Sequence, residues 1–270
     1  MRVVSFERGG AVYAGVLAGS GVVEVGQGGV GELLRRGRLP AEPPPGDPIP
    51  LDSVRLLPPV VDPQKIVCLG LNYRSHAEEA GLEAPVVPTF FAKWPNALAP
   101  PGAEVRLPSY SQKVDYEAEV AFVIGRRCRD VPEADAVDAI AGYTLLNDLS
   151  ARDYQFKTPQ WGPGKVFDGS APCGPALVTP DEAGPPDAIE ISLTLNGERM
   201  QAASTADLIH SIPALVAYLS QLMTLEPGDL ISTGTPAGVG SVRQPRVWLK
   251  AGDELVVESP QLGRLETRLA

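Results

Sequence analysis

The chain has few residues that could hold a soft metal ion or form cross-links. Among its 270 residues there are only two histidines, His76 and His210, and three cysteines that are far apart in the sequence. A disulfide framework and a zinc cluster are therefore not indicated, because both need closely matched sets of cysteine or histidine residues. A metal bound by this chain must be held mainly by oxygen atoms.

Basic residues are outnumbered by acidic ones, and long apolar runs are missing. The chain has 23 Lys and Arg against 33 Asp and Glu, which gives a formal net charge of -10. A surface of this sign repels nucleic acids and anionic membranes, so we expect neither as a partner. No apolar run reaches the roughly 20 residues of a membrane-spanning helix, and Glu7 stands where a signal peptide would be apolar. We therefore expect a cytoplasmic protein.

The composition is that of a globular protein, with 44% hydrophobic and 21% charged residues. Short β-forming runs separated by glycine turns in residues 2–25 predict a small β meander, and residues 32–36 predict a short helix. The proline-rich residues 40–50 are unsuited to regular structure. We therefore predict a small N-terminal β domain with a proline-rich connector in residues 1–60 and a larger domain in residues 61–270.

Residues 114–125 predict a strand that carries several carboxylates. β-branched and aromatic residues dominate this run. Side chains two positions apart on a strand share a face, so Asp115, Glu117 and Glu119 would lie in a row. Three carboxylates without a cation between them repel one another unless water or a bound cation screens them. The run indicates a divalent-metal site, although a half-buried strand with one wet face would show the same alternation.

Another acid follows the next apolar strand, which we predict over residues 139–146. Asp148 lies just after this strand, where an acidic side chain is well placed to point into a site. We interpret Asp148 as the third metal ligand. The alternative is that it caps a helix over residues 149–154.

A histidine and a glutamate lie together on a predicted short helix. Asn72 or Ser75 could cap this helix and Gly81 would end it. His76 and Glu79 are then neighbours three positions apart on one face. A histidine held by a carboxylate is typical of a general base, but an exposed helix with an incidental ion pair is the alternative.

Two loops of the larger domain are candidates for contacts with a ligand. Lys165 lies in a glycine-rich loop that lacks the spacing and the Ser or Thr of a phosphate loop. Residues 233–240 are rich in Gly and Thr, so their backbone N–H groups could face an anion, or the loop could be an ordinary tight connection.

Other expectations concern packing. An Asn-Gly pair at residues 196–197 predicts a β-hairpin. Residues 206–223 are predicted to contain a helix capped by Ser211, with a core face formed by Leu215, Leu219 and Leu222. Cys173 and His210 have no reactive context in the sequence and are expected to be structural.

Together these motifs resemble the fumarylacetoacetate hydrolase family, and they occur in the order found in that family. They extend from about residue 65 to residue 240 and consist of Gly70-Leu71-Asn72-Tyr73 with His76 and Glu79, Asp115-Tyr116-Glu117-Ala118-Glu119, Asn147-Asp148 with Ala151-Arg152-Asp153 and Gln155, Lys165 with Phe167-Asp168, and the glycine-rich loop at 233–240.

The resemblance implies a mixed β (α+β) fold around a distorted β-roll or β-sandwich, usually as a homodimer. It implies a divalent ion, Mg²⁺ with Mn²⁺ or Ca²⁺ as alternatives, held by Glu117, Glu119 and Asp148. His76, Glu79 and Lys165 would be the catalytic residues, with the helix of His76 in a lid over the substrate. The residues implied to bind substrate are Arg74, Gln155, Thr233, Gly234 and Thr235.

The resemblance also implies the class of reaction. A small anionic 2-oxo acid would complete the shell of the ion and react through an enolate, which serves isomerisation, decarboxylation and C–C hydrolysis alike. The chain lacks the long N-terminal region of the eukaryotic fumarylacetoacetate enzyme and is not duplicated, so fumarylacetoacetate itself is a less expected substrate. We expect a 2-hydroxyhepta-2,4-diene-1,7-dioate isomerase type of enzyme. An acylpyruvate hydrolase of the fumarylpyruvate kind and an oxaloacetate decarboxylase are alternatives, and a non-catalytic binding protein is an alternative of another class.

Overall fold

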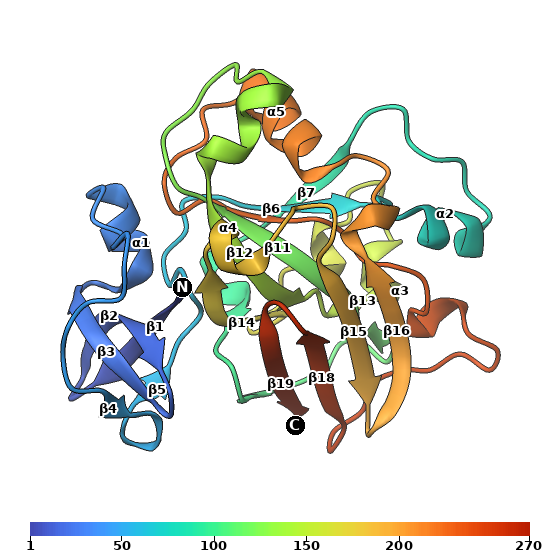
Figure 1. The fold of residues 1–270 in the computed structure, drawn as a ribbon. Helices are drawn as coiled ribbons and strands as arrows, with labels where there is room; N and C mark the ends of the chain where they lie inside the picture. Colours follow the sequence, from blue (N-terminus) through green and yellow to red (C-terminus); the bar gives the residue numbers. More distant parts are fainter.

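A computed structural model of the chain describes all 270 residues as a mixed α+β fold with two main sheets (Figure 1). The larger sheet has twelve strands and the smaller sheet has five. A two-stranded ribbon is formed by β10 (Val114–Asp115) and β13 (Ser150–Ala151). The mixed α+β class that the sequence predicts is confirmed.

The N-terminal residues form the predicted β meander and short helix. Their elements are β1 (Arg2–Arg8), β2 (Ala11–Ala18), β3 (Gly21–Gln27), α1 (Gly29–Arg35), β4 (Ile49–Pro50) and β5 (Arg55–Leu56). Gly9 and Gly10 join the first two strands with φ angles of 59° and 78°, a conformation that glycine adopts without strain. β1 also pairs with β14 (Ala171–Val178), so the meander extends the large sheet. That residues 1–60 form a domain of their own stays a prediction.

The other half of the large sheet carries the strands from which the site is built. Beyond β14, its path runs through β12 (Ile140–Asn147), β11 (Ala118–Ile124), β17 (Leu230–Ser232), β6 (Ile66–Gly70) and β7 (Thr89–Lys93), with β8 (Leu98–Ala99) paired to β14. β11 is buried along its whole length, so it has no wet face. Asp115 and Glu117, which precede β11, are buried as well, so the alternation of acids over residues 115–119 has another cause than solvent exposure.

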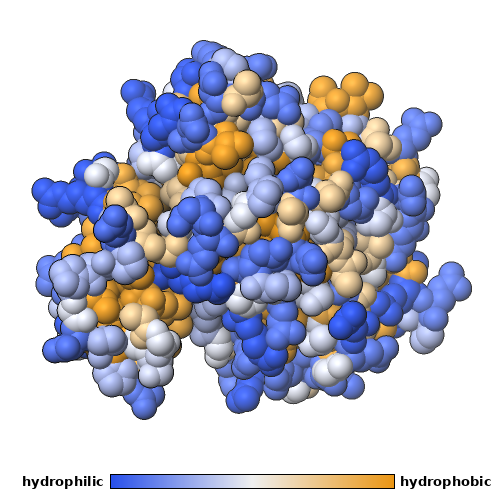
Figure 2. Space-filling view, viewed as in Figure 1, coloured by the Kyte–Doolittle hydropathy of each residue, from blue (hydrophilic) through white to orange (hydrophobic).

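The smaller sheet packs over the central strands of the large one (Figure 1). Its strands are β16 (Glu198–Ser204), β15 (Glu190–Leu195), β18 (Glu254–Ser259), β19 (Gly263–Leu269) and β9 (Ala103–Val105). Asn196 and Gly197 connect β15 to β16 with positive φ angles of 52° and 84°, as the Asn-Gly pair predicts. Alternate residues of β19 are exposed, and hydrophilic residues cover much of this face in Figure 2. The inner faces of the two sheets share one apolar cluster, which includes Phe122, Leu145, Leu193 and Leu255.

The helices are short and lie around the sheets. They are α1 with α2 (Arg74–Ala80), α3 (Arg152–Gln155), α4 (Pro180–Ala183) and α5 (Ile212–Leu222). The Ser211 side chain caps α5 by accepting the Ala214 N–H, as predicted. The prediction for Leu222 is wrong, because the helix ends at this residue and its side chain is 51% exposed. None of the helices has both the length and the apolar character needed to cross a membrane.

The residues expected to be structural are packed in the protein. Cys68, Cys128 and Cys173 are buried free thiols, and burial raises the pKa of Cys173 to about 12. The His210 N–H donates to the Asn72 side-chain oxygen at 2.9 Å. The His210 ring lies 3.0 Å from the Pro85 carbonyl oxygen.

Candidate metal centre and active site

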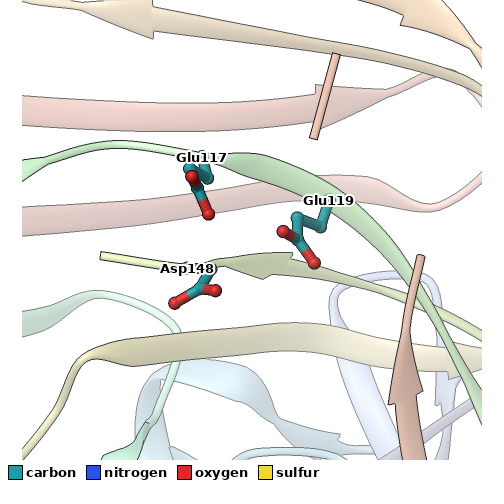
Figure 3. Close-up of side chains that lie close together, drawn as sticks. All are labelled: Glu117, Glu119 and Asp148. Atoms are coloured by element: carbon teal, nitrogen blue, oxygen red, sulfur yellow. The ribbon is translucent and has the colours of Figure 1, made fainter. Parts of the chain in front are cut away.

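The three acids predicted as metal ligands are brought together by the pairing of β11 with β12. Glu117 directly precedes β11, Glu119 is the second residue of that strand, and Asp148 directly follows β12. Because the strands are antiparallel with Ala118 opposite Asn147, the start of one meets the end of the other. One ligand oxygen from each of the three acids lies within 4.8 Å of the other two. Their side chains point into a common space (Figure 3).

Asp115 does not join this cluster, and the prediction that it shares the face of the two glutamates is wrong. The strand predicted over residues 114–125 is interrupted after Asp115, which turns this side chain elsewhere. The carboxylate accepts the backbone N–H groups of Gly240 and Ser241 at 2.7 and 3.0 Å. It also accepts the Arg152 guanidinium at 2.9 Å. Asp115 therefore anchors a cation beside the cluster.

Three buried cations contact the carboxylates. Lys165 Nζ lies 2.6 Å from Glu117 Oε2 and 2.8 Å from Asp148 Oδ2. Lys93 Nζ is 2.8 Å from Asp148 Oδ1, and Arg152 is 2.7 Å from Glu117 Oε1. The sequence reasoning included Lys165 but missed Lys93 and Arg152 as members of the site. The only signal for Lys93 is a lysine at the end of an otherwise apolar strand.

These charges stabilise the ionised form of Glu117, whereas the ionised form of Glu119 is destabilised. Burial acts to raise the pKa of the Glu117 carboxyl, but Arg152 and Lys165 outweigh it and hold that pKa at about 2. Burial raises the pKa of the Glu119 carboxyl well above its usual range, and repulsion from Asp148 and Glu117 adds to the rise. Glu119 is therefore the position where a further positive charge would be most stabilising.

The donor set fits a hard divalent cation. All three candidate ligands offer carboxylate oxygens, which Mg²⁺, Mn²⁺ and Ca²⁺ prefer. Two oxygens on opposite sides of such an ion lie about 4 to 5 Å apart, and the observed atoms lie within 4.8 Å of one another. Glu119 Oε2 accepts the Ser232 hydroxyl and the Gly234 N–H, whereas its Oε1 accepts no hydrogen bond from the protein. One oxygen of Glu119 is thus left for a ligand.

His76 and Glu79 lie on one face of α2, as predicted. His76 Nδ1 is 3.6 Å from Glu79 Oε2, a contact longer than a hydrogen bond. Both oxygens of Glu79 also accept the Gly238 N–H at 3.0 Å, which ties α2 to the 233–240 loop. Burial lowers the pKa of His76, although the charge of Glu117 opposes this effect. The imidazole is therefore neutral at neutral pH, the form that accepts a proton.

A cavity of about 330 Å³ is lined by His76 and by two of the three acids, Glu117 and Glu119, whereas Asp148 is not part of its lining. Its polar lining consists of His76, Thr89, Glu117, Glu119, Arg152, Gln155, Lys165, Thr235 and Ser241. Phe91 and Trp161 form part of the apolar wall, with ring centroids 5.8 Å apart, and Lys165 Nζ lies 4.9 Å from the Phe91 ring centre. A ligand in this cavity would meet charged groups at one part and apolar side chains at another.

The residues predicted to bind substrate are divided by the structure. Gln155 and Thr235 line the cavity, as does Lys165. Thr233 and Gly234 do not line the cavity. The Thr233 hydroxyl donates to the Val120 carbonyl oxygen, and the Gly234 N–H donates to the Glu119 carboxylate. Arg74 is exposed and lies outside the lining, where it reaches the Ala206 carbonyl oxygen at 3.4 Å.

The backbone of the 233–240 loop binds anions of the protein itself. Its N–H groups at Gly234, Gly238 and Gly240 donate to Glu119, Glu79 and Asp115, respectively. The loop therefore positions a metal-ligand candidate, the partner of the histidine and the anchor of Arg152. This function explains its glycine content better than direct binding of a ligand by these three N–H groups.

The sequence is similar to those of known proteins. A model of the fumarylacetoacetate (FAA) hydrolase C-terminal family matches residues 65–270. The mitochondrial oxaloacetate tautomerase fahd2 of Xenopus laevis is 43% identical over 215 residues, which are 79% of this chain and 67% of that protein.

Solved structures are similar over the whole chain. One is a fumarylacetoacetate hydrolase from Exiguobacterium antarcticum, with a TM-score of 0.90, 33% identity, and coverage of 100% of this chain and 99% of that one. Another is a 5-carboxymethyl-2-hydroxymuconate delta-isomerase from Mycobacterium smegmatis, with a TM-score of 0.83, 36% identity, and coverage of 100% and 98%.

Proposed function

Because this chain belongs to the fumarylacetoacetate hydrolase family, we propose that it is a divalent-metal-dependent isomerase of 2-oxo and 2-hydroxy-dienoic diacids, of the 2-hydroxyhepta-2,4-diene-1,7-dioate isomerase type. The observation that carries this proposal is that His76, Glu117 and Glu119 line one cavity, with one carboxylate oxygen of Asp148 within 4.8 Å of an oxygen of each glutamate. Such an enzyme has to move a proton to or from carbon while an oxygen atom of the substrate becomes more negative. The histidine would move the proton, and a metal ion held by the carboxylates would stabilise the negative charge on the oxygen.

The polar part of the cavity would bind the oxo-acid end of the substrate. When bound to Glu117, Glu119 and Asp148, the divalent ion would supply a Lewis acid for the substrate oxygen. Lys165 places its ammonium group next to two of these acids and lines the cavity. It would hold positive charge near the developing enolate oxygen. Gln155, whose side-chain oxygen accepts the Arg152 guanidinium, would donate a hydrogen bond from its amide nitrogen that orients the acid, whereas the Thr235 hydroxyl already donates to the Ala118 carbonyl oxygen.

His76 would transfer the proton at carbon. Its Nδ1 is turned to Glu79, which leaves Nε2 for the substrate. Glu79 would favour the tautomer that carries a proton on Nδ1 and would stabilise the ring once it gains a second proton. The backbone N–H of Gly238 keeps Glu79 in place. The apolar wall near Phe91 and Trp161 would limit water around the carbon chain, which favours proton transfer over hydrolysis.

Keto–enol tautomerisation of oxaloacetate is a second candidate, since the 43% identical relative is an oxaloacetate tautomerase. Tautomerisation needs the same groups, because a proton moves between the oxygen and the carbon next to the carbonyl carbon. Acylpyruvate hydrolysis and oxaloacetate decarboxylation are further candidates on the same site. In acylpyruvate hydrolysis His76 would activate the attacking water. In oxaloacetate decarboxylation the C–C bond would break without the participation of water.

A substrate panel tests the proposal. The purified protein would be assayed spectrophotometrically with 2-hydroxyhepta-2,4-diene-1,7-dioate, enol-oxaloacetate, oxaloacetate and acylpyruvates, each with Mg²⁺ and with a chelator. We expect chelator-sensitive isomerisation of the dienoic diacid. Faster tautomerisation of oxaloacetate would favour the second candidate, and no turnover of any compound with Mg²⁺ would favour a binding protein on the same scaffold. We also expect a homodimer, which light scattering after size-exclusion chromatography would test.

A further inference from the structure

A groove adjoins the cavity and shares one of its walls. Arg152, Phe156, Ser241 and Val242 line both spaces. The groove has a volume of about 410 Å³, and its other lining residues are Lys113, Asp153, Arg246 and Trp248. A ligand that extends beyond the cavity past Phe156 and Val242 would therefore enter a second space with its own charges.

The two outer cations of the groove have no anionic partner in the protein. Neither Lys113 nor Arg246 makes an ion pair, and both are exposed. The cations of the inner cavity differ, since Arg152 and Lys165 are held by Asp115, Glu117 and Asp148. In a chain with a net charge of -10, two cations without partners that line the same groove are available to an anion from solution.

The one acid of the groove is already engaged. Asp153 accepts the Ser111 hydroxyl at 2.5 Å and the Gln112 N–H at 3.2 Å. These hydrogen bonds favour its ionised form against the effect of its partial burial, so the pKa of Asp153 is lowered. Its negative charge reduces the net charge of the groove, but Lys113 and Arg246 still leave it positive.

The backbone on both sides of the groove is tied to the site. The Lys113 carbonyl oxygen accepts the Arg152 N–H at 2.9 Å. Arg246 precedes Val247, whose N–H donates to the Gly240 carbonyl oxygen at 3.0 Å, while the Gly240 N–H holds Asp115. The two cations therefore stand on segments with fixed positions relative to the inner carboxylates.

We propose that Lys113 and Arg246 bind the distal carboxylate of the substrate and thereby select diacids longer than oxaloacetate. The inner cavity offers no free cation to a second carboxylate, and the apolar side chains of Phe156 and Val242 suit the carbon chain between the two ends. Trp248 adds an apolar surface to the groove. The proposal rests on the proposed function in one respect, the binding of the oxo-acid end at Glu117, Glu119 and Asp148.

Direct binding tests the subsite without requiring turnover. Isothermal titration calorimetry of the Mg²⁺-loaded protein would compare 2-oxoheptanedioate with 2-oxoheptanoate, which lacks the distal carboxylate. We expect the wild-type protein to bind the diacid about tenfold more tightly, as for charge-assisted hydrogen bonds to two cations. The double variant Lys113→Gln with Arg246→Gln should lose this preference and bind the monoacid as the wild type does.

The control is a double variant that removes the same charge elsewhere. Arg38 and Arg106 are exposed, make no ion pair and lie outside the groove, so Arg38→Gln with Arg106→Gln should keep the preference for the diacid. Equal wild-type affinities for both acids, equal weakening of both by the groove variant, or the same loss in the control would overturn the subsite. A selective protein that turns over no substrate would contradict the proposed function and support the subsite.

Discussion

Replacing Glu119 by Gln should weaken metal binding and, with no metal bound, stabilise the protein. Glu119 is 1% exposed, and burial among Asp148 and Glu117 raises the pKa of its carboxyl well above its usual range. The neutral amide avoids this repulsion, and its oxygen can still accept the Ser232 hydroxyl and the Gly234 N–H. We expect metal-free Glu119→Gln to be more stable by on the order of 1 kcal/mol.

The loss in metal affinity has the opposite sign and is larger. Loss of an outer group that only orients a metal ligand costs about 10- to 100-fold in affinity, so the loss of a charged ligand should cost at least the upper value, about 100-fold. At a Mg²⁺ concentration of about 100 times the wild-type Kd, binding stabilises the wild type by about 2.7 kcal/mol. A variant that binds about 100-fold more weakly gains only about 0.4 kcal/mol under the same conditions.

Thermal unfolding with chelator and with Mg²⁺ measures both effects. A change of 1 kcal/mol corresponds to a shift of roughly 2 to 4 °C in Tm for a chain of this size. Glu119→Gln should melt higher than the wild type in chelator and lower than it in Mg²⁺. Glu198→Gln is the control, because Glu198 is exposed and makes no ion pair. An undiminished Mg²⁺ response of Glu119→Gln would remove Glu119 from the ligand set, and a lower Tm in chelator would refute the electrostatic argument.

Other predictions concern the base, the cation and the wall of the cavity. His76→Ala should lower kcat by about 100-fold or more while leaving the Mg²⁺ affinity from calorimetry unchanged; equal loss of both would indicate a structural role. Because burial lowers the pKa of His76, wild-type kcat should hold as pH falls through the usual histidine range near 6.5 and drop only at lower pH; a drop centred at 6.5 or above would contradict this. Lys165→Met should destabilise the metal-free protein by about 3 kcal/mol in urea unfolding, at the low end for a broken buried ion pair, because each acid keeps a second cation; an unchanged midpoint would contradict it. Gly70→Ala should raise KM, because a Cβ there would lie 2.1 Å from a ring atom of Trp161, and an unchanged KM would show that the ring does not shape the bound state.

The carboxylate cluster could be predicted because its geometry is mostly local. Glu117 and Glu119 are two positions apart, and Asp148 follows an apolar strand, so a single antiparallel pairing completes the set. The fate of Asp115 could not be predicted in this way. Its partners Arg152, Gly240 and Ser241 are distant in sequence, and together they hold its carboxylate away from the face that strand parity assigns to it.

Helix α2 shows the same limit of local reasoning. Gly81 ends it in a left-handed conformation with a φ of 64°, as predicted from the sequence. Asn72 was a candidate for its cap, but the Asn72 side chain donates instead to the carbonyl oxygens of Thr233 and His210. Tyr73, which directly precedes the first residue of α2, makes no capping hydrogen bond with its side chain. Hydrogen bonds between distant segments have replaced the local one, and no pattern within the helix indicates them.

The charges of the buried cluster imply that metal and substrate bind cooperatively. When all four buried carboxylates are ionised, as they would be around a bound cation, they face three buried cations, which leaves one net negative charge among Asp115, Glu117, Glu119, Asp148, Lys93, Arg152 and Lys165. A divalent ion changes this charge to one positive, and one carboxylate of the substrate then restores neutrality. Because the interior screens charges weakly, the ion should strengthen substrate binding, and by linkage the substrate should strengthen binding of the ion by the same factor. Titration of Mg²⁺ with and without a saturating 2-oxo acid measures this factor, and a value of one would mean that the two ligands do not share the cluster.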